Sequence, residues 1–285
     1  MERRKMGRLE ERKKEMNSLI HSFIYQSKKF TWYACFDYGF KTYFISGKKT
    51  AEFTYDYDYF NFVKSTKMLM SIRELLKKNH NEDVFILIRS MFESYLSTRY
   101  FSENNDKIDE FIFNPTMMAL AYYNITTDGT LINRDKEEVG KLINPAGFKM
   151  GKDKKYYNDF YAFLCMFAHA NYGVANLYTD GKGGYDLTRE NYPIIVRLFT
   201  IFVFTKIFEH VVTVDGEDFI DVRTEKICYE LVRKSIALQE ELFDDVIEAY
   251  SKVEQDFYQF RNKRMIKMLN NMKKSLKEEL GSLKK

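Results

Sequence analysis

The ionisable side chains that could do chemistry occur in two apolar segments, residues 83–101 and 156–172. In the first, Arg89 and Glu93 are four residues apart, so they share one face of a predicted helix. Charges in such apolar surroundings are costly unless they are paired. In the second, His169 falls in the last turn of a predicted helix. Because a helix C-terminus favours the imidazolium form, His169 could act as a general acid or base near neutral pH.

The remaining candidate residues are polar side chains that extend these two faces, namely Tyr161, Asn171 and Arg99. Two interpretations of the group stay open. Arg89, Glu93 and His169 could form a catalytic or binding site, or they could form a satisfied polar network that only fixes the packing of two helices.

The pattern of these residues resembles a large bacterial family of helical proteins of uncharacterised function. An apolar helix that ends in Arg-Ser-x-x-Glu is followed by a helix of the form Tyr-x-x-x-Cys/Ser-x-x-x-His. The resemblance covers residues 60–212, roughly half of the chain, and is carried by Arg89, Ser90, Glu93, Tyr161, Cys165 and His169.

That family is in turn similar in layout to the HEPN helical-bundle proteins, many of which are metal-independent ribonucleases of toxin and antiviral systems that act as dimers. The resemblance implies a HEPN-like fold and an RNA or nucleotide ligand. The usual HEPN signature has an Arg shortly before a His on one helix, whereas residues 162–165 here are Ala, Phe, Leu and Cys. A ribonuclease site would therefore take its Arg from the other helix.

Such a site needs a base for the ribose hydroxyl and a cation for the phosphate. His169 could be the base and Arg89 the cation, with Glu93 orienting Arg89. Tyr161 or Asn171 would hold the substrate. This interpretation predicts a metal-independent ribonuclease effector of bacterial antiviral defence or stress response. The alternative is a non-catalytic helical scaffold that oligomerises.

The composition limits the other classes of function. Three cysteines occur singly, without a Cys-x-x-Cys pair or a nearby His cluster, so we expect reduced thiols in a cytoplasmic protein and no structural metal. Dinucleotide, P-loop and kinase motifs are absent from the sequence, and we predict no cofactor. The N-terminus lacks the apolar core of a secretory signal. Charged residues interrupt the most apolar stretch, residues 192–214, which predicts a buried helix and no membrane partner.

The formal net charge of +4 is unevenly distributed. Residues 1–15 and 261–285 carry an excess of Lys and Arg, and the segment between them carries an excess of Asp and Glu. Basic ends could contact nucleic acid or an acidic partner, and such contacts would weaken in salt. Solvated helix faces would give the same pattern.

Apolar residues at three- and four-residue spacing, with only three prolines, predict an all-α helical bundle. The expected helices cover residues 3–28, 59–78, 82–103, 106–113, 115–124, 156–171, a segment from about 189, and one or two long helices within 221–280. Residues 42–46 and 53–59 alternate polar and apolar around a Gly-Lys-Lys turn and could form a small β-hairpin. Residues 126–155 contain four glycines and a proline and predict a loop with one helical turn at 136–142.

We therefore expect three parts: an N-terminal helix and aromatic-rich segment (1–58), a core bundle (59–216) with the inserted loop, and a long C-terminal extension (217–285). The aromatic-rich segment suits core or interface packing, although aromatic rings can also stack on single-stranded bases. The extension carries an apolar stripe typical of a coiled coil. An isolated amphipathic helix leaves such a stripe in water, so we expect a homo-oligomer formed through these helices. The stripe comprises Met265, Met268, Met272, Leu276 and Leu280.

Overall fold

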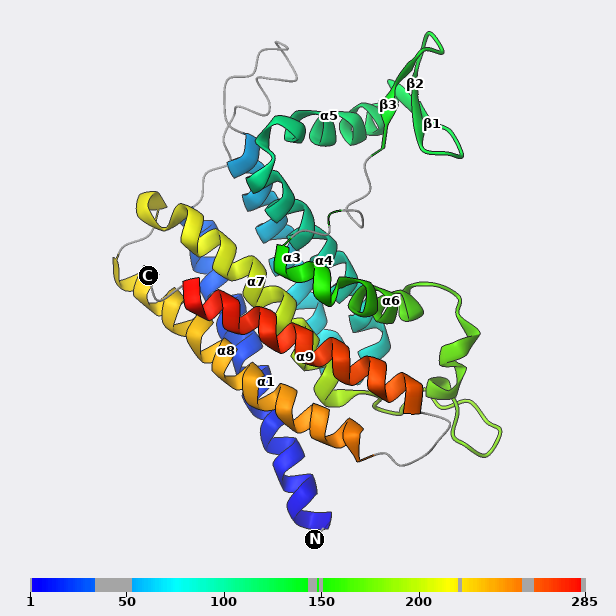
Figure 1. Cartoon of the computed structure of the whole chain (residues 1–285), viewed down its shortest axis with the longest axis vertical. Coiled ribbons are helices and arrows are strands. Elements are labelled where there is room, and N and C mark those ends of the chain that lie inside the picture. Colours follow the sequence, from blue (N-terminus) through cyan, green and yellow to red (C-terminus); the bar gives the residue numbers. More distant parts are fainter. Residues whose placement is uncertain are drawn as a thin grey trace. The chain divides into compact units, whose positions relative to one another are not determined.

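The computed structural model describes residues 2–33, 53–142, 148, 151–219, 222–252 and 259–282, and most of them are helical (Figure 1). The contacts divide the chain into two compact units. The first unit contains Met1–Cys35, Phe62–Phe92 and Gly151–Lys285, and the second contains Phe36–Asn61 and Glu93–Met150. The mainly helical prediction is confirmed.

The first unit is built on four long helices that pack one against the next. Helix α1 (Glu2–Tyr33) lies against α7 (Pro193–Phe219), α7 lies against α8 (Val222–Ser251), and α8 lies against α9 (Gln259–Ser282). The shorter α6 (Tyr157–Ala168) and the 3-10 helix η3 (Gly151–Lys155) both contact α9.

Two helices contribute to both units. Helix α3 (Phe53–Lys77) begins in the second unit and continues into the first, and α4 (Asn81–Glu103) begins in the first and ends in the second. The chain therefore passes between the units within continuous helices.

Helix α7 is the centre of the first unit, because its side chains are apolar on every face and nearly all buried from Val196 to Val212. Its phenylalanines pack edge to face against rings from the surrounding helices, with ring centroids 5.4 Å apart for Phe204 and Phe23 of α1 and 5.0 Å apart for Phe199 and Phe160 of α6. Burying each such ring contributes about 1.5–3 kcal/mol. No described helix is long and apolar enough to cross a membrane.

A charged pair lies inside this apolar core. The Lys206 ammonium of α7 is 3.6 Å from the Asp153 carboxylate of η3, and both side chains are completely buried. Lys206 also donates a hydrogen bond to the Ser275 hydroxyl of α9 at 3.0 Å, and the Tyr156 hydroxyl donates to Asp153. The group joins α7, α9 and η3. Its hydrogen bonds offset part of the desolvation cost of the two charges.

The two C-terminal helices form an antiparallel hairpin within one chain. Lys273 of α9 pairs with Asp244 of α8 at 2.6 Å. Lys277, one turn later on α9, approaches Glu240, one turn earlier on α8, so the two helices run in opposite directions. The apolar stripe that led us to expect self-association is covered inside the first unit, because Met268, Met272 and Leu276 are fully buried or nearly so. The reason for expecting oligomerisation through this stripe is therefore removed.

The second unit contains an aromatic core and a small sheet. Tyr57 of α3 packs against Phe101 of α4 and Phe111, with centroids 5.6 and 5.7 Å away, and its hydroxyl donates to Ser97 at 2.8 Å. Phe111 belongs to α5 (Ile108–Ala119), which follows the short 3-10 helix η1 (Asn105–Lys107). The sequence predicted two helices here, interrupted before Pro115, but Pro115 lies within the single helix α5.

The sheet consists of β1 (Tyr123–Ile125), β2 (Thr130–Asn133) and β3 (Glu138–Lys141), antiparallel in that order. Its first turn contains Gly129 at φ 83°, and the Asp128 carboxylate accepts hydrogen bonds from the Thr126 and Thr130 hydroxyls. Two sequence predictions are wrong here. Residues 126–142 are not a loop with a helical turn, because the strands pair and leave no helical segment at 136–142.

The predicted N-terminal hairpin is also wrong in its second strand, the part that lies within the described residues. Residues 53–59 form the first turns of α3, where Tyr57 packs on Phe101 and Phe111. Residues 42–46 and the Gly-Lys-Lys turn lie outside the described residues.

Candidate functional site

The interface between α4 and α6 places Arg89 beside Tyr161. Phe85 of α4 stacks on Phe167 with centroids 4.4 Å apart, and Phe92 packs edge to face on Phe160 at 5.0 Å. These aromatic contacts lie on either side of Arg89 along α4 and fix the two helices against each other. Arg89 and Tyr161 are both half-buried at this interface.

The contact between the two side chains is specific. Arg89 donates hydrogen bonds from Nε and Nη2 to the Tyr161 hydroxyl oxygen at 3.2 and 2.8 Å, and the guanidinium carbon lies 5.1 Å from the ring centroid. Tyr157, one turn earlier, stacks on Tyr161 with centroids 5.4 Å apart and limits its movement. Two N–H groups thus converge on one oxygen, as they do when a guanidinium binds a phosphate or carboxylate oxygen.

His169 lies at the end of α6. The sequence placed it in the last turn, but α6 ends at Ala168, and His169 is the C-cap residue with extended backbone angles, φ −120° and ψ 160°. Its side chain is exposed, and among the described residues it makes no hydrogen bond or ion pair. Eight residues separate it from Tyr161, which corresponds to about 12 Å along a helix axis. The structure therefore joins Arg89 to Tyr161 but leaves His169 at a distance.

The other predicted site residues have separate surroundings. The Asn171 side-chain oxygen accepts a hydrogen bond from the Gly173 backbone N–H at 2.9 Å and caps the 3-10 helix η4 (Tyr172–Tyr178). Glu93 and Arg99 lie on the part of α4 that belongs to the second unit. The guanidinium carbon of Arg99 is 5.7 Å from the ring centroid of Tyr95, so it rests on an aromatic face.

The side chains that could act as metal ligands are dispersed in the described part of the chain. Within the described ranges, no group of three His, Cys, Asp or Glu side chains lies close enough to hold a metal ion. Cys165 is half-buried, and Cys228 is buried so that desolvation raises the pKa of its thiol to about 11. Cys228 is therefore a packed, unreactive thiol.

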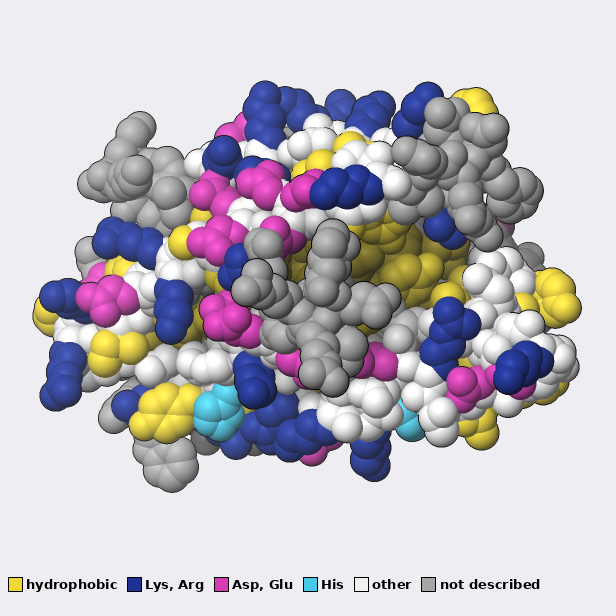
Figure 2. Space-filling model, turned by 90° about the horizontal axis from the view of Figure 1, so that it is seen from below, with side chains coloured by type: hydrophobic (Ala, Val, Ile, Leu, Met, Phe, Trp, Pro, Cys, Tyr) yellow, Lys and Arg dark blue, Asp and Glu magenta, His cyan; other side chains and the backbone are white. Residues whose placement is uncertain are grey.

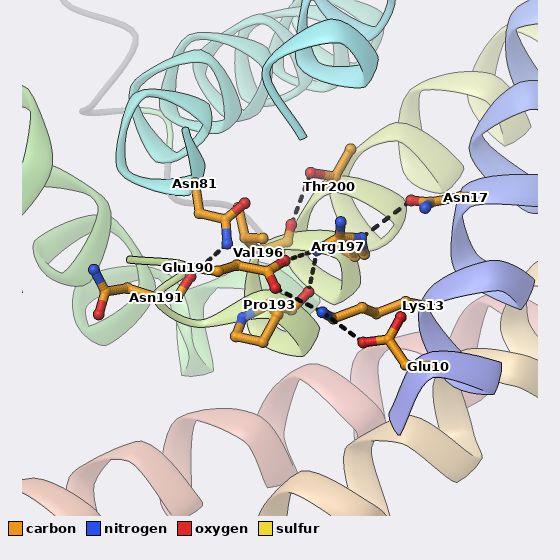
Figure 3. A network of polar contacts seen from close by, with 10 residues as sticks. All are labelled: Glu10, Lys13, Asn17, Asn81, Glu190, Asn191, Pro193, Val196, Arg197 and Thr200. Atoms are coloured by element: carbon orange, nitrogen blue, oxygen red, sulfur yellow. Dashed lines mark hydrogen bonds and ion pairs between the residues drawn. The ribbon is translucent and has the colours of Figure 1, made fainter. Parts of the chain in front are cut away.

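A polar network that the sequence did not reveal joins α1 to the beginning of α7 (Figure 3). Glu190 accepts hydrogen bonds from Lys13 at 2.6 Å and from Arg197 at 3.4 Å. Arg197 is only 4% exposed, and it also donates to Asn17 at 3.0 Å and to the Pro193 carbonyl at 2.7 Å. Burial lowers the pKa of Arg197. For Lys13, desolvation lowers the pKa, but the hydrogen bonds that Lys13 donates to Glu190 and Glu10, together with the charges of these carboxylates, outweigh it and raise the pKa.

A second polar cluster holds the turn before α7. The Asn191 amide donates to the Glu82 carboxylate at 2.6 Å and to the Leu177 carbonyl at 2.8 Å, and Asn81 donates to the Asn191 carbonyl at 2.5 Å. The next residue, Tyr192, has a φ of 51°, a conformation that is unfavourable for a bulky side chain. Its ring packs 6.0 Å from Phe85. The Asn191 contacts and this packing hold the strained residue in place.

Arg197 was visible in the sequence as a charge that interrupts an apolar segment. The sequence did not reveal its partners on α1, because Lys13 and Asn17 lie almost two hundred positions earlier in the chain. No local pattern connects them.

Residues 55–186 match DUF5677, a family of unknown function. The matched segment begins in α3 and ends before α7, and it contains the whole α4–α6 interface with Arg89, Tyr161 and His169. Similarity to an uncharacterised family is thereby confirmed, although the DUF5677 segment differs in extent from the expected 60–212. Comparisons with curated proteins and with solved structures found no match.

Proposed function

We propose that this protein binds RNA or a nucleotide at the α4–α6 interface, as a HEPN-like protein. The observation that supports the proposal is the Arg89 guanidinium, whose Nε and Nη2 groups both point at one oxygen. A phosphate oxygen is a stronger acceptor than a phenolic hydroxyl because it carries charge. It would take the position of the Tyr161 hydroxyl, which requires the Tyr161 ring to leave its stack on Tyr157, and the aromatic packing of α4 on α6 would hold the guanidinium in place.

The activity that we propose for this site is metal-independent RNA cleavage, in a defence or stress effector. The cleavage and the defence role come from the resemblance to HEPN proteins. His169 supplies an exposed imidazole at the end of the helix that carries Tyr161. It lies about 12 Å along α6 from Tyr161, well beyond a hydrogen bond. A phosphate held by Arg89 is therefore out of reach of His169 of the same chain, and in our proposal His169 of a second copy acts as the base.

A non-catalytic scaffold is the second candidate, and one observation favours it. The Arg89–Tyr161 contact lies between two aromatic pairs of a packed helix interface, where it would fix the angle between α4 and α6 without any ligand. In this case the contact of Arg89 with Tyr161 belongs to a structural network, and the exposed His169 side chain lies apart from it.

The two candidates differ in what Arg89→Ala and Tyr161→Phe would do. Binding of a fluorescent single-stranded RNA, followed by anisotropy, should weaken at least about tenfold in Arg89→Ala, since hydrogen bonds to charged groups contribute about 1.5–3 kcal/mol. Tyr161→Phe should bind as well as the wild type or more tightly, because the competing hydroxyl is gone. Arg73→Ala, which removes an Arg paired with Glu74 on α3, is the matched control.

Cleavage of the same RNA should be measured with a chelator present, for the wild type and for His169→Ala. Loss of cleavage in folded His169→Ala would support the ribonuclease. If the wild type neither binds nor cleaves RNA, and Arg89→Ala and Tyr161→Phe both lower the melting temperature, the scaffold is the correct assignment.

A further inference from the structure

The last helix of the first unit, α9, is strongly basic. It contains seven Lys or Arg residues but only two Glu residues, both near its end. Its flank toward α8 is neutralised, because Lys273 and Lys277 face carboxylates of α8. The side on which α9 faces the viewer in Figure 1 forms the upper edge of the view from below in Figure 2, and Lys and Arg side chains gather along this edge.

Three lysines form the outward side of α9, namely Lys263, Lys267 and Lys274. Steps of four and seven residues return to the same side of a helix, and all three lysines are exposed. Along the helix axis they are about 6 and about 10 Å apart. Asn270, which is exposed between them, is uncharged, so no acidic residue interrupts the row.

The 3-10 helix η3 extends this row of positive charge. The Asn271 side-chain amide of α9 donates a hydrogen bond to the Lys155 carbonyl at 3.2 Å, so η3 lies beside the row. Lys154 and Lys155 are exposed as well. Among the described residues, no carboxylate forms an ion pair with any of the five lysines. We call these five the lysine face, which comprises Lys154, Lys155, Lys263, Lys267 and Lys274.

A chain of phosphates fits the lysine face better than a protein or a membrane does. Protein interfaces have an apolar core and contain few lysines, and helices that lie on membranes expose an apolar side. From Lys263 to Lys274, the exposed residues of α9 are all Lys, Arg or Asn. A lysine ammonium binds phosphate as a point charge, and such contacts do not depend on the sequence of a nucleic acid.

Helix α6 connects the lysine face with the Arg89 interface, because it contacts both α4 and α9. On the side toward α9, the Asp159 carboxylate is paired with Arg264 at 2.5 Å, which cancels the acidic charge that a phosphate chain would otherwise meet there. The exposed residues Asn158 and Ala162 of α6 are uncharged. A strand that crosses α6 has to span about 10–12 Å, the diameter of a helix.

We propose that the lysine face binds the phosphate backbone of a single-stranded RNA that continues across α6 from Arg89. This inference rests on the proposed function, in which Arg89 holds one phosphate of the strand. The lysine face supplies affinity that is independent of base sequence and orients the strand.

One variant of the full chain that combines Lys263→Gln, Lys267→Gln and Lys274→Gln tests the proposal. Binding of a labelled single-stranded RNA is followed by fluorescence anisotropy over a series of salt concentrations. The variant should bind at least about tenfold more weakly at about 0.1 M salt, and the slope of log K against log salt should become shallower by about 2, since each phosphate contact of a single strand contributes about 0.7. Replacing the same three lysines by arginine keeps the charge and should restore both values.

The matched control combines Lys28→Gln, Lys64→Gln and Lys67→Gln, at exposed positions on α1 and α3. It removes the same charge and should bind like the wild type. Circular dichroism checks that each variant is folded. The proposal is overturned if the control weakens binding as much as the α9 variant does, if the wild type binds no RNA, or if polyglutamate or phosphatidylserine vesicles bind more tightly than the RNA.

Arg89→Ala, measured beside the α9 variant, separates this proposal from the proposed function. We expect both to weaken binding. If only the α9 variant does so, the lysine face binds RNA and the Arg89 site does not. If only Arg89→Ala does so, the lysine face is overturned and the proposed function stands.

Discussion

Replacing Lys206 by methionine should destabilise the protein more than any exposed lysine substitution could. Methionine keeps most of the length of the side chain but removes the charge, so Asp153 loses a partner 3.6 Å away in a site without solvent. Removing one member of a buried ion pair costs about 3–5 kcal/mol. The hydrogen bond from Lys206 to Ser275 is lost as well, and it is the link from this pair to α9.

The measurement is the free energy of unfolding in urea, for Lys206→Met, Asp153→Asn and the double variant. Each single variant leaves one charge of the pair in the core without the opposite charge, whereas the double variant removes both charges. The double variant should therefore lose clearly less than the sum of the two single losses. Lys226→Met, at an exposed position on α8, is the matched control and should change stability by no more than about 0.5 kcal/mol.

Two results would refute this reasoning. One is a Lys206→Met protein as stable as the Lys226→Met control, which would mean that the pair contributes no more than surface charges do. The other is strict additivity in the double variant, which would mean that Lys206 and Asp153 do not interact energetically.

Three further predictions concern other parts of the first unit. Asn191→Ala should lower stability by about 2–3 kcal/mol, measured by urea unfolding, because it leaves the buried Glu82 carboxylate and the Leu177 carbonyl without their amide donor; an unchanged midpoint would contradict this. Leu276→Ala, in the stripe, should cost about 2–5 kcal/mol through the cavity it creates, while the mass in light scattering stays that of the wild type, since the stripe is covered within one chain; a halved mass would show an interface instead. Cys228 should resist iodoacetamide at pH 8.5 in the native protein and react after unfolding, as detected by mass spectrometry, because burial raises its thiol pKa to about 11; rapid native modification would show that the thiol is accessible.

The long helices could be predicted from the sequence because their apolar residues recur closely and Gly or Pro occurs only near their ends. Helix α4 was predicted within one residue of each observed end, and α7 begins at Pro193, close to the predicted start near residue 189. The sheet could not be found in this way. Its strands have only three or four residues, and Leu131 is the one strand residue that is fully buried, so almost no alternation of polar and apolar residues marks it.

The site residues proposed from the sequence stay a prediction. Arg89 stood out because a charge in an apolar helix needs a partner, whereas Arg197 and Lys206 were noted only as charges that interrupt an apolar segment. The partners themselves depend on tertiary packing. Asp153 lies in a segment rich in Gly and Lys, where nothing in the local sequence indicates that it is buried against Lys206.

The order in which the pieces of the first unit occur in the chain has a consequence for its synthesis. Helix α7 leaves the ribosome before α8, yet α8 packs along it and covers part of its apolar surface. Arg264 and Asn271 of α9 also hold Asp159 of α6 and the Lys155 carbonyl, at 2.5 and 3.2 Å. The first unit cannot close its core until α8 and α9 have emerged, so the nascent chain carries a phenylalanine-rich α7 that only earlier elements such as α1 and α6 can cover during this interval. A chaperone that shields apolar segments would act on the chain during this interval.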